Sequence, residues 1–221
     1  MRREVRMEDI SDGRLYGSND MVKAGCGGCV GCFACCCHMG TSIVLDPLDA
    51  HRLSKGMSKG FEELIGHEVE LNVADGLILP NLKMAGQEER CAFLNEQGRC
   101  SIHEFRPGIC RLFPLGRYYE DRSFRYFLQT HECKQENRTK VKVKKWLDTP
   151  DLEAYETFIC DWHFFLADLQ NRMDGGNREA LARAYSLELL QTFYLTPYEE
   201  DVDFYSQFAA RLQNVKKRLE K

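Results

Sequence analysis

Apolar residues recur every three or four positions through the last third of the chain. This spacing is typical of helices that bury one face, and it predicts three of them. The first begins after Pro150, because proline is favoured in the first helical turn, and the glycines at 175 and 176 end it. Its apolar stripe comprises Leu152, Tyr155, Ile159, Trp162, Leu166, Leu169 and Met173.

The second and third helices show the same spacing. We expect Asn177 to cap the second helix, and Thr196 and Glu199 to form a capping box that starts the third, with Pro197 in its first position. Their stripes are usually core or dimer packing rather than a cofactor site. They comprise Leu181, Ala184, Tyr185, Leu189 and Phe193 in the second helix, and Val202, Tyr205, Ala209, Leu212 and Val215 in the third.

Before residue 148 the apolar pattern is short and irregular. A helix is predicted from Asp46, because Pro47 falls in its first turn. Aromatic runs on both sides of the polar turn 120–123 predict a hairpin, while the alternating residues 139–145 fit either an edge strand or a helix start. Further short strands are predicted at 42–45, at 76–84, and within 91–102 on both sides of a turn at Gly98.

These elements predict an α+β fold. Its first part is a small, irregular cysteine-rich domain with short strands and helices, and its second is a C-terminal all-α segment of about three helices. The expected divisions are an N-terminal segment over 1–22, a cysteine-cluster domain over 23–147 and a helical segment over 148–221. A chain of 221 residues is long enough to bury a core unaided.

Composition narrows the functional classes. The 43% hydrophobic and 29% charged residues indicate a globular protein, and a net charge of -4 disfavours a nucleic-acid partner. The charged first twenty residues contain no apolar run of signal-peptide length, and no later stretch resembles a membrane helix. We therefore expect a cytoplasmic protein without a membrane partner. In that reducing compartment, an odd count of 11 cysteines favours metal ligation over disulfides.

Six of the cysteines fall within residues 26–37. Two cysteines separated by two residues can direct their sulfurs at one point, as in zinc and iron–sulfur sites. Two ligand choices overlap here, and neighbouring glycines permit the tight backbone that a metal-binding loop requires. The choice that matches bacterial ferredoxin spacing is Cys26, Cys29, Cys32 and Cys36, and the other is Cys29, Cys32, Cys35 and Cys36.

Four more cysteines, at 91, 100, 110 and 133, match no zinc-finger spacing and would have to meet through folding. Four thiolates around Zn²⁺ carry a net charge of -2, which a partly buried site must offset with donors or cations. Surface salt bridges to Glu104, Glu120 and Asp121 are an equally good reading of the nearby arginines. These are Arg99, Arg106, Arg111, Arg117, Arg122 and Arg125.

The segments 29–36, 49–52 and 91–114, followed by Cys133, resemble the YkgJ-type cysteine cluster proteins. This zinc- or iron-chelating CxxCxxCC family also includes flagellin lysine N-methylases. The resemblance covers roughly residues 26–147. It implies eight metal ligands and leaves Cys26, Cys37 and Cys160 outside the set. The implied ligands are Cys29, Cys32, Cys35, Cys36, Cys91, Cys100, Cys110 and Cys133.

The overlapping CxxC steps and the methylase relatives favour an iron–sulfur cluster, with [4Fe-4S] as the expected type and zinc as the alternative. His38, His103 and His131 could each replace a ligand, although a surface or packing role is the simpler reading. Three functions stay open. They are a metal-binding module with the helices as an interface for an unidentified protein partner, a lysine N-methylase-like enzyme using S-adenosylmethionine, and a structural zinc domain.

Overall fold

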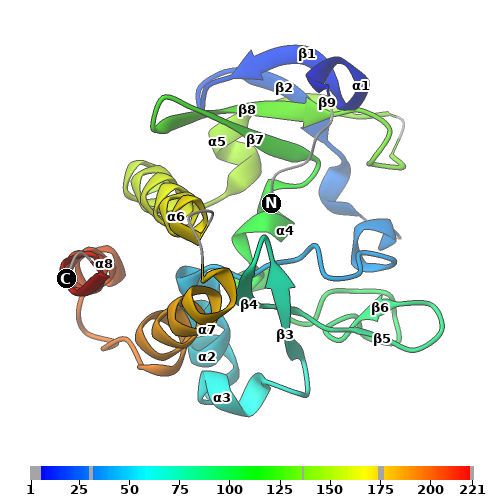
Figure 1. Cartoon of the computed structure of the whole chain (residues 1–221). Helices are drawn as coiled ribbons and strands as arrows, with labels where there is room; N and C mark the ends of the chain where they lie inside the picture. Colours follow the sequence, from blue (N-terminus) through cyan, green and yellow to red (C-terminus); the bar gives the residue numbers. More distant parts are fainter. Residues whose placement is uncertain (1–5, 30–31, 136, 174–176, 220–221) are drawn as a thin grey trace.

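The computed structural model describes residues 6–29, 32–135, 137–173 and 177–219 and has the predicted α+β fold (Figure 1). The helices are α1 (Met7–Ile10), α2 (Pro47–Met57), α3 (Phe61–Leu64), α4 (Gly108–Leu112), α5 (Val143–Leu147), α6 (Leu152–Met173), α7 (Arg178–Leu189) and α8 (Phe204–Leu219). The strands are β1 (Ser11–Tyr16), β2 (Met21–Gly25), β3 (Val69–Ala74), β4 (Leu77–Leu82), β5 (Met84–Ala85), β6 (Arg90–Cys91), β7 (Leu115–Glu120), β8 (Ser123–Gln129) and β9 (Thr139–Lys142). Short 3-10 turns η1 (Gly27–Cys29), η2 (Ala34–Cys36) and η3 (His103–Phe105) and a π-helical segment η4 (Leu190–Leu195) complete the described structure.

The strands form small antiparallel sheets. The largest has the order β1-β8-β7, and the pairs β2-β9, β3-β4 and β5-β6 stand separately. The predicted hairpin is confirmed, since Glu120 pairs with Ser123 at the tip of β7 and β8. Residues 139–145 form both of the structures that their pattern allowed, an edge strand and a helix start. The strand β9 pairs with β2, and the chain then passes directly into α5.

One predicted start in the helical segment is wrong. No helix begins at Thr196, and α8 starts instead after Asp203, whose carboxylate accepts the Ser206 N–H at 2.7 Å. The register of the buried face moves accordingly, so that Val202 and Ala209 are exposed. The side chains of α8 that are buried are Phe204, Phe208, Leu212 and Val215.

Smaller corrections concern two other elements. Asn177 occupies the N-cap position of α7, but its backbone is in the left-handed conformation and its side chain makes no capping hydrogen bond. Ala184, expected on the buried face of the same helix, is exposed. Residues 42–45 form only an isolated bridge between Val44 and Asn81 rather than a strand. The glycines expected to end α6, at 175 and 176, lie outside the described residues.

The main hydrophobic core includes side chains from both halves of the chain. Leu45 and Leu53 from the cysteine-rich part pack in the same cluster as Trp162, Phe193 and Phe208 from the helical part. A smaller cluster under the β1-β8-β7 sheet includes Val22, Leu115 and Tyr126. The division at residue 147 stays a prediction, because burial alone does not separate folding units.

A buried polar network connects α2 with the elements that pack on it. Asp46 and Asp49 form a reciprocal capping box at the start of α2, in which each carboxylate accepts the other residue's backbone N–H. Asp49 also accepts the Gly108 N–H at 2.7 Å, which fixes the start of α4. The Tyr155 hydroxyl of α6 accepts a hydrogen bond from Arg117 Nη2 of β7 at 2.8 Å. Carboxylates and guanidinium are therefore enclosed in the same region, where charge is costly unless it is paired.

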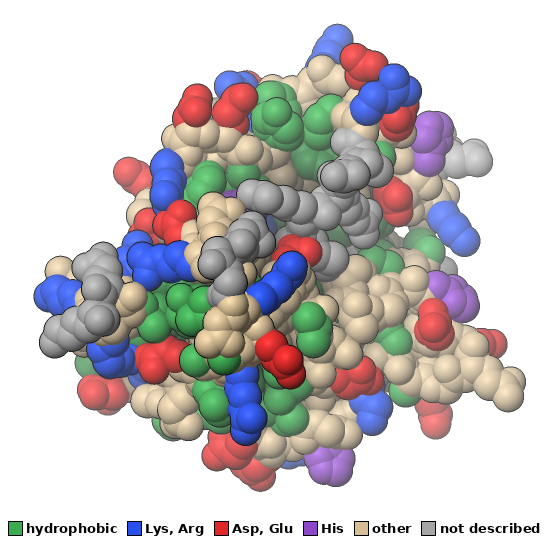
Figure 2. Space-filling view, in the orientation of Figure 1, with side chains coloured by type: hydrophobic (Ala, Val, Ile, Leu, Met, Phe, Trp, Pro, Cys, Tyr) green, Lys and Arg blue, Asp and Glu red, His purple; other side chains and the backbone are tan. Residues whose placement is uncertain are grey.

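The surface carries charges of both signs interspersed, as Figure 2 shows for one face. This mixed distribution agrees with the small net charge of -4. Within the described part of the chain, every helix is too short or too polar to cross a bilayer.

Asp46 should make stability depend on pH. Burial, followed by the charge of Asp49, raises the pKa of the Asp46 carboxyl to about 8. The folded state therefore binds more protons than the unfolded chain between about pH 4 and 8, and the free energy of unfolding falls as pH rises through that window. Asp46→Asn keeps the Oδ1 acceptor for Asp49 N–H, and we expect it to flatten the decline in urea titrations at several pH values.

The matched control is Asp201→Asn on the exposed loop before α8, which should leave the pH dependence unchanged. An Asp46→Asn protein with the wild-type slope would show that another group titrates.

Candidate metal centre

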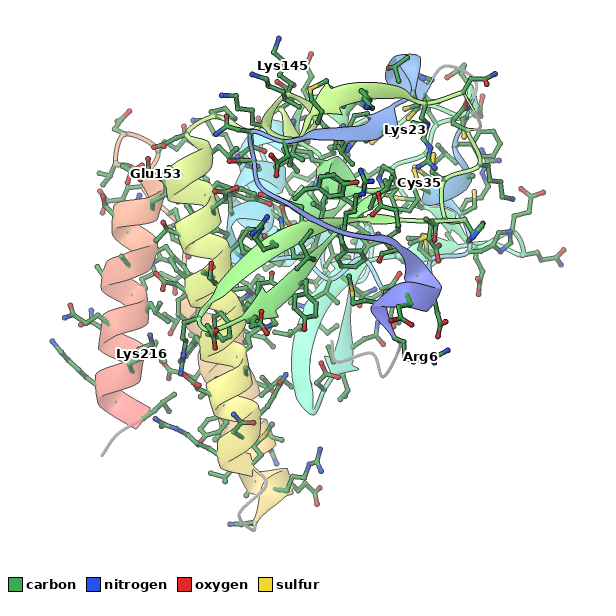
Figure 3. All side chains as sticks on the ribbon, turned by 90° about the horizontal axis from the view of Figure 1, so that it is seen from above. Arg6, Lys23, Cys35, Lys145, Glu153 and Lys216 are labelled. Carbon is green, nitrogen blue, oxygen red and sulfur yellow. The ribbon has the colours of Figure 1, made fainter. Side chains whose placement is uncertain are left out.

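The cysteines gather on one side of the molecule. Figure 3 shows Cys35 on the side away from α6 and α8, which carry the labelled Glu153 and Lys216. Ten of the eleven lie between residues 26 and 133, and all eleven are free thiols. The eleventh, Cys160, lies on α6, outside this part of the chain. Nine of the ten clustered cysteines fall into an inner and an outer group, and the tenth, Cys37, bridges Arg90 of β6.

Five cysteines line one cavity of about 60 Å³, here called the inner cavity. Sites for organic ligands usually measure about 300–1,000 Å³, so this space suits an ion or a compact inorganic group rather than a substrate. Its other walls are mostly apolar and include Ile43, Leu82 and Phe93. The cysteines that line it are Cys35, Cys36, Cys91, Cys100 and Cys110.

Cys35 and Cys36 reach the inner cavity from the turn η2. Backbone contacts attach this turn to β6, since Cys37 forms a bridge with Arg90 and the His38 N–H donates to Glu89 O at 2.9 Å. The thiols of the CxxCxxCC segment are thereby held next to Cys91, although more than fifty residues separate them in sequence.

Cys91 and Cys100 belong to the compact segment around β6. Cys91 pairs with Met84 of β5, and Cys100 bridges Leu94 across the turn. Gly98 has φ +68° in that turn, and a Cβ there would lie 2.9 Å from the Phe33 ring. A glycine is therefore required both by the backbone and by the approach of the η2 segment.

Cys110 is supplied by α4, whose position depends on Asp49. Asp49 is 2% exposed and accepts the N–H of Gly108, two residues before the cysteine. Gly108 also lies so close to the Tyr155 hydroxyl that there is no space for a side chain. Asp49 and Gly108 were not predicted as site residues, although the D-x-x-D capping pattern at 46–49 was visible in the sequence.

Four of the inner thiols, those of Cys35, Cys91, Cys100 and Cys110, have a raised pKa and are hard to ionise in the absence of a metal. The hydrogen bond with Cys36, followed by burial, raises the pKa of Cys35. Burial is the main cause of the raised pKa of Cys91, Cys100 and Cys110, and the charge of Asp49 adds to the shift at Cys110. A metal that binds here must therefore displace protons, so its affinity should increase with pH.

Arg106 supplies positive charge to the inner cavity. It lines the cavity, and its charge opposes the upward pKa shifts of Cys35 and Cys100. Its Nε is buried and has no hydrogen-bond partner within the described part of the chain. An unsatisfied buried donor beside five thiols fits an anionic, thiolate-ligated centre, because such a centre would supply the missing acceptor.

The outer group comprises Cys26, Cys29, Cys32 and Cys133, none of which lines the inner cavity. The sulfurs of Cys26 and Cys29 are 3.1 Å apart. Cys29 interacts electrostatically with Cys35 and Cys133, which places it between the two groups. The eight cysteines implied by the family resemblance are thus split five and three, and Cys26 joins the three.

The remaining candidates lie apart from the inner cavity. His38 faces Glu89 at 3.7 Å, and His103 Nε2 lies 3.1 Å from Arg106 Nη1. His131 is exposed, and Cys160 is half-buried on α6. Within the described ranges, no three His, Cys, Asp or Glu side chains are positioned to hold a metal ion as they stand.

The predicted arginines have several different partners. Arg99 Nη1 donates to Cys29 O at 3.1 Å, while Arg122 pairs with Asp168 rather than with the acidic residues near it in sequence. Arg111 and Arg125 bond backbone carbonyl groups. Only Arg106 of the six lines the inner cavity.

Residues 28–144 match a protein family, CxxCxxCC, described as "Putative zinc- or iron-chelating domain". The match spans more than half of the chain. The chain belongs to the CxxCxxCC family. This membership supports metal binding in general, and every inner-cavity cysteine lies within the matched residues. Cys26 and the helices α6 to α8 lie outside them.

No curated protein and no solved structure matches this CxxCxxCC chain.

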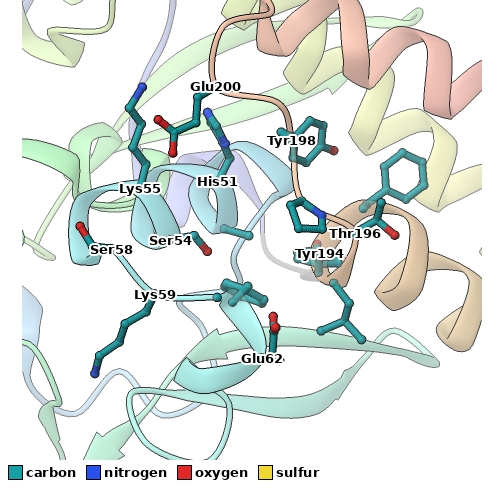
Figure 4. Close-up of a pocket in the computed structure, with 16 residues that line it drawn as sticks. His51, Ser54, Lys55, Ser58, Lys59, Glu62, Tyr194, Thr196, Tyr198 and Glu200 are labelled. Atoms are coloured by element: carbon teal, nitrogen blue, oxygen red, sulfur yellow. The ribbon is translucent and has the colours of Figure 1, made fainter.

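A second, larger pocket of about 430 Å³ lies between α2, α3 and the segment that follows η4 (Figure 4). His51, Ser54 and Lys55 line it from α2, and Tyr198 and Glu200 line it from the other side. None of its lining residues is a cysteine. The pocket is therefore separate from the metal-binding chemistry of the CxxCxxCC domain.

Gly108→Ala tests how closely α4 is held. The added methyl group would collide with the Tyr155 hydroxyl, which Arg117 holds in place. Overpacking of this kind costs about 1–3 kcal/mol, and we expect a loss of that size in the free energy of unfolding measured with urea. Gly17→Ala is the control, since its Cβ would meet only Asp20 Oδ2, at 3.6 Å. Equal stability of the two variants would contradict the tight contact.

Proposed function

We propose that the protein is a metal-binding module that holds an iron–sulfur cluster in the inner cavity. The observation that carries the proposal is the convergence of five family cysteines, from three separate segments, on one small space. Cys91, Cys100 and Cys110 would hold the centre together with Cys35 or Cys36. In the bound state the sulfurs would turn toward a common point, which a change of χ1 rotamer permits.

The surroundings of the inner cavity support a cluster. Apolar walls limit access of solvent, and hydrogen bonds to sulfur and burial are the means by which proteins tune cluster potentials. Arg106 would offset part of the negative charge. Such a centre would supply electron transfer or metal storage, and the protein residues would hold it, exclude water and balance charge.

A lysine N-methylase-like enzyme would require a site for S-adenosylmethionine, and two described pockets, of about 430 and 380 Å³, have the volume of a small-molecule site. The larger is the pocket between α2, α3 and the segment that follows η4. Its lining residues and those of the inner cavity do not overlap. A cofactor bound there would not touch a cluster in the inner cavity. Metal binding without methyl transfer is therefore the better-supported function.

Anaerobic purification followed by metal analysis and absorption spectroscopy tests the proposal. We expect iron, sulfide and broad absorption near about 400 nm, the signature of thiolate-bound clusters. Cys110→Ser should lose most of the iron, because it removes a thiol that lines the inner cavity. Cys160→Ser is the matched control on α6 and should keep the full spectrum.

If the purified protein is colourless and holds stoichiometric zinc, and if Cys110→Ser loses that zinc, then the inner cavity binds zinc instead of a cluster. Metal content unaffected by Cys110→Ser would exclude the inner cavity as the binding site.

A further inference from the structure

The strand β3 lies at the edge of its sheet. It pairs with β4, and a single bridge between Ile65 and Val69 covers its first residue. The other side of β4 is occupied, because Leu45 N–H donates to Pro80 O at 2.8 Å. In Figure 1, β4 accordingly lies between β3 and α7. The outer edge of β3 is therefore the place where a further strand can pair.

The register of the hairpin shows which backbone groups face that edge. In an antiparallel ladder, two opposite residues either exchange both hydrogen bonds or point their backbone groups away from each other. Leu71 is opposite Pro80, and Val73 is opposite Ile78. Both pairs are of the second kind, since Pro80 O accepts from outside the hairpin and Ile78 N–H donates to Ser186 Oγ at 2.9 Å. The N–H and C=O groups of Leu71 and Val73 therefore point out of the free edge, and none of these four groups has a hydrogen-bond partner among the described residues.

The side chains along this edge are apolar and exposed. Val73 is 72% exposed and Leu71 is 40% exposed, and Ile78 beside them on β4 is 36% exposed. Proteins usually protect an edge with lysine, proline or a bulge, and β3 contains none of these. Its one charged residue, Glu70, projects from the opposite face, beside the buried Asn81. The edge is thus an unprotected template for another strand.

We infer that β3 pairs with β3 of a second copy of this chain, so that two molecules share one four-stranded sheet. The two outward-pointing residues match each other in an antiparallel register whose twofold axis passes through Asn72. Leu71 then exchanges both hydrogen bonds with Val73 of the partner subunit, and Val73 does the same with Leu71 of the partner subunit. All four edge groups of each chain are satisfied in this way. Twofold pairing of identical surfaces is also the commonest symmetry of self-association.

The same register is compatible in charge and in the faces of the sheet. Glu70 lies opposite Ala74 of the partner subunit, so no like charges face each other across the new pair. On the other face, the exposed side chains of Leu71, Val73 and Ile78 join those of the partner subunit in one apolar surface. A shift by one residue would set outward-pointing groups against inward-pointing ones and move the apolar side chains to the other face. This self-complementarity favours a second copy over an unrelated strand.

The pairing goes beyond the proposed metal binding and does not depend on it. No residue of β3 lines the inner cavity, although Leu82, which does, is paired with Val69. Because the two β3 strands run in opposite directions, the two inner cavities would lie toward opposite ends of the shared sheet.

Sedimentation velocity at increasing concentrations of the full-length, metal-loaded protein tests the pairing, under reducing conditions that prevent crosslinking through cysteine. We expect the wild type to shift from a monomer toward a species of twice its mass. Val73→Lys should stay monomeric, because it places a charge within the apolar face of the new pair. Leu187→Lys is the matched control, since Leu187 is also apolar and 62% exposed but lies on α7, and it should associate as the wild type does.

Val73→Pro tests the backbone hydrogen bonds separately. Proline lacks the N–H that would bond the partner subunit, and the β3–β4 ladder keeps its bonds because this N–H points away from β4. Two symmetry-related hydrogen bonds are lost, so we expect the association to weaken by about 10–100-fold. Circular dichroism checks the fold of each variant, and metal content should be unchanged in all three.

Three results would overturn the pairing. They are a wild type that is monomeric at every concentration, a dimer that Val73→Lys leaves intact, and a dimer that Leu187→Lys abolishes. A monomeric wild type would leave the edge to an extended segment of another protein. None of these results bears on the proposed cluster, which fails through absent iron or through Cys110→Ser that keeps its metal.

Discussion

The hydrogen bond from Gly108 N–H to the Asp49 carboxylate is the contact on which the arrangement of the inner cavity depends. It joins the start of α2 to the start of α4, and α4 carries Cys110. Because Asp49 is almost completely buried, its carboxylate must be satisfied by neighbouring donors, and the two backbone N–H groups of Asp46 and Gly108 do so. The close contact of Gly108 with Tyr155 then positions the same junction against α6.

The same region shows how charge is distributed between the metal-binding and helical parts. Arg117 is buried against Tyr155 and interacts with Asp46, while Arg106 lines the inner cavity. The two arginines therefore lie beside different acidic groups, Arg117 beside the capping carboxyl groups and Arg106 beside the thiols. A site that gathers several thiolates without such cations would be opposed by charge repulsion and desolvation. Family membership explains the shared cysteines, and the buried arginines explain how this fold can accommodate them.

Sequence patterns predicted the elements whose signals are local. The helix start at Asp46, the hairpin at 120–123 and the α6 stripe are confirmed, because turn chemistry and helical spacing determine them over a few residues. The start at Thr196 was wrong because the capping-box pattern there competes with tertiary contacts. Arg211 bonds the carbonyls of Thr196 and Pro197, and the chain forms no helix until α8 begins after Asp203. The division of the cysteines into two groups could not be predicted, since it depends on the pairing of β2 with β9 and on the η2 contact with β6.

The pairing of β2 with β9 has a consequence for the order of folding. It joins Gly25 to Thr139 across 114 residues, so the strand partner of β2 leaves the ribosome only after almost all the cysteines have been synthesised. Closing so long a segment costs entropy that grows with the logarithm of its length. The pairing of β2 with β9 is therefore expected to close later than the local hairpin of β7 and β8, whose strands are joined by a turn of two residues.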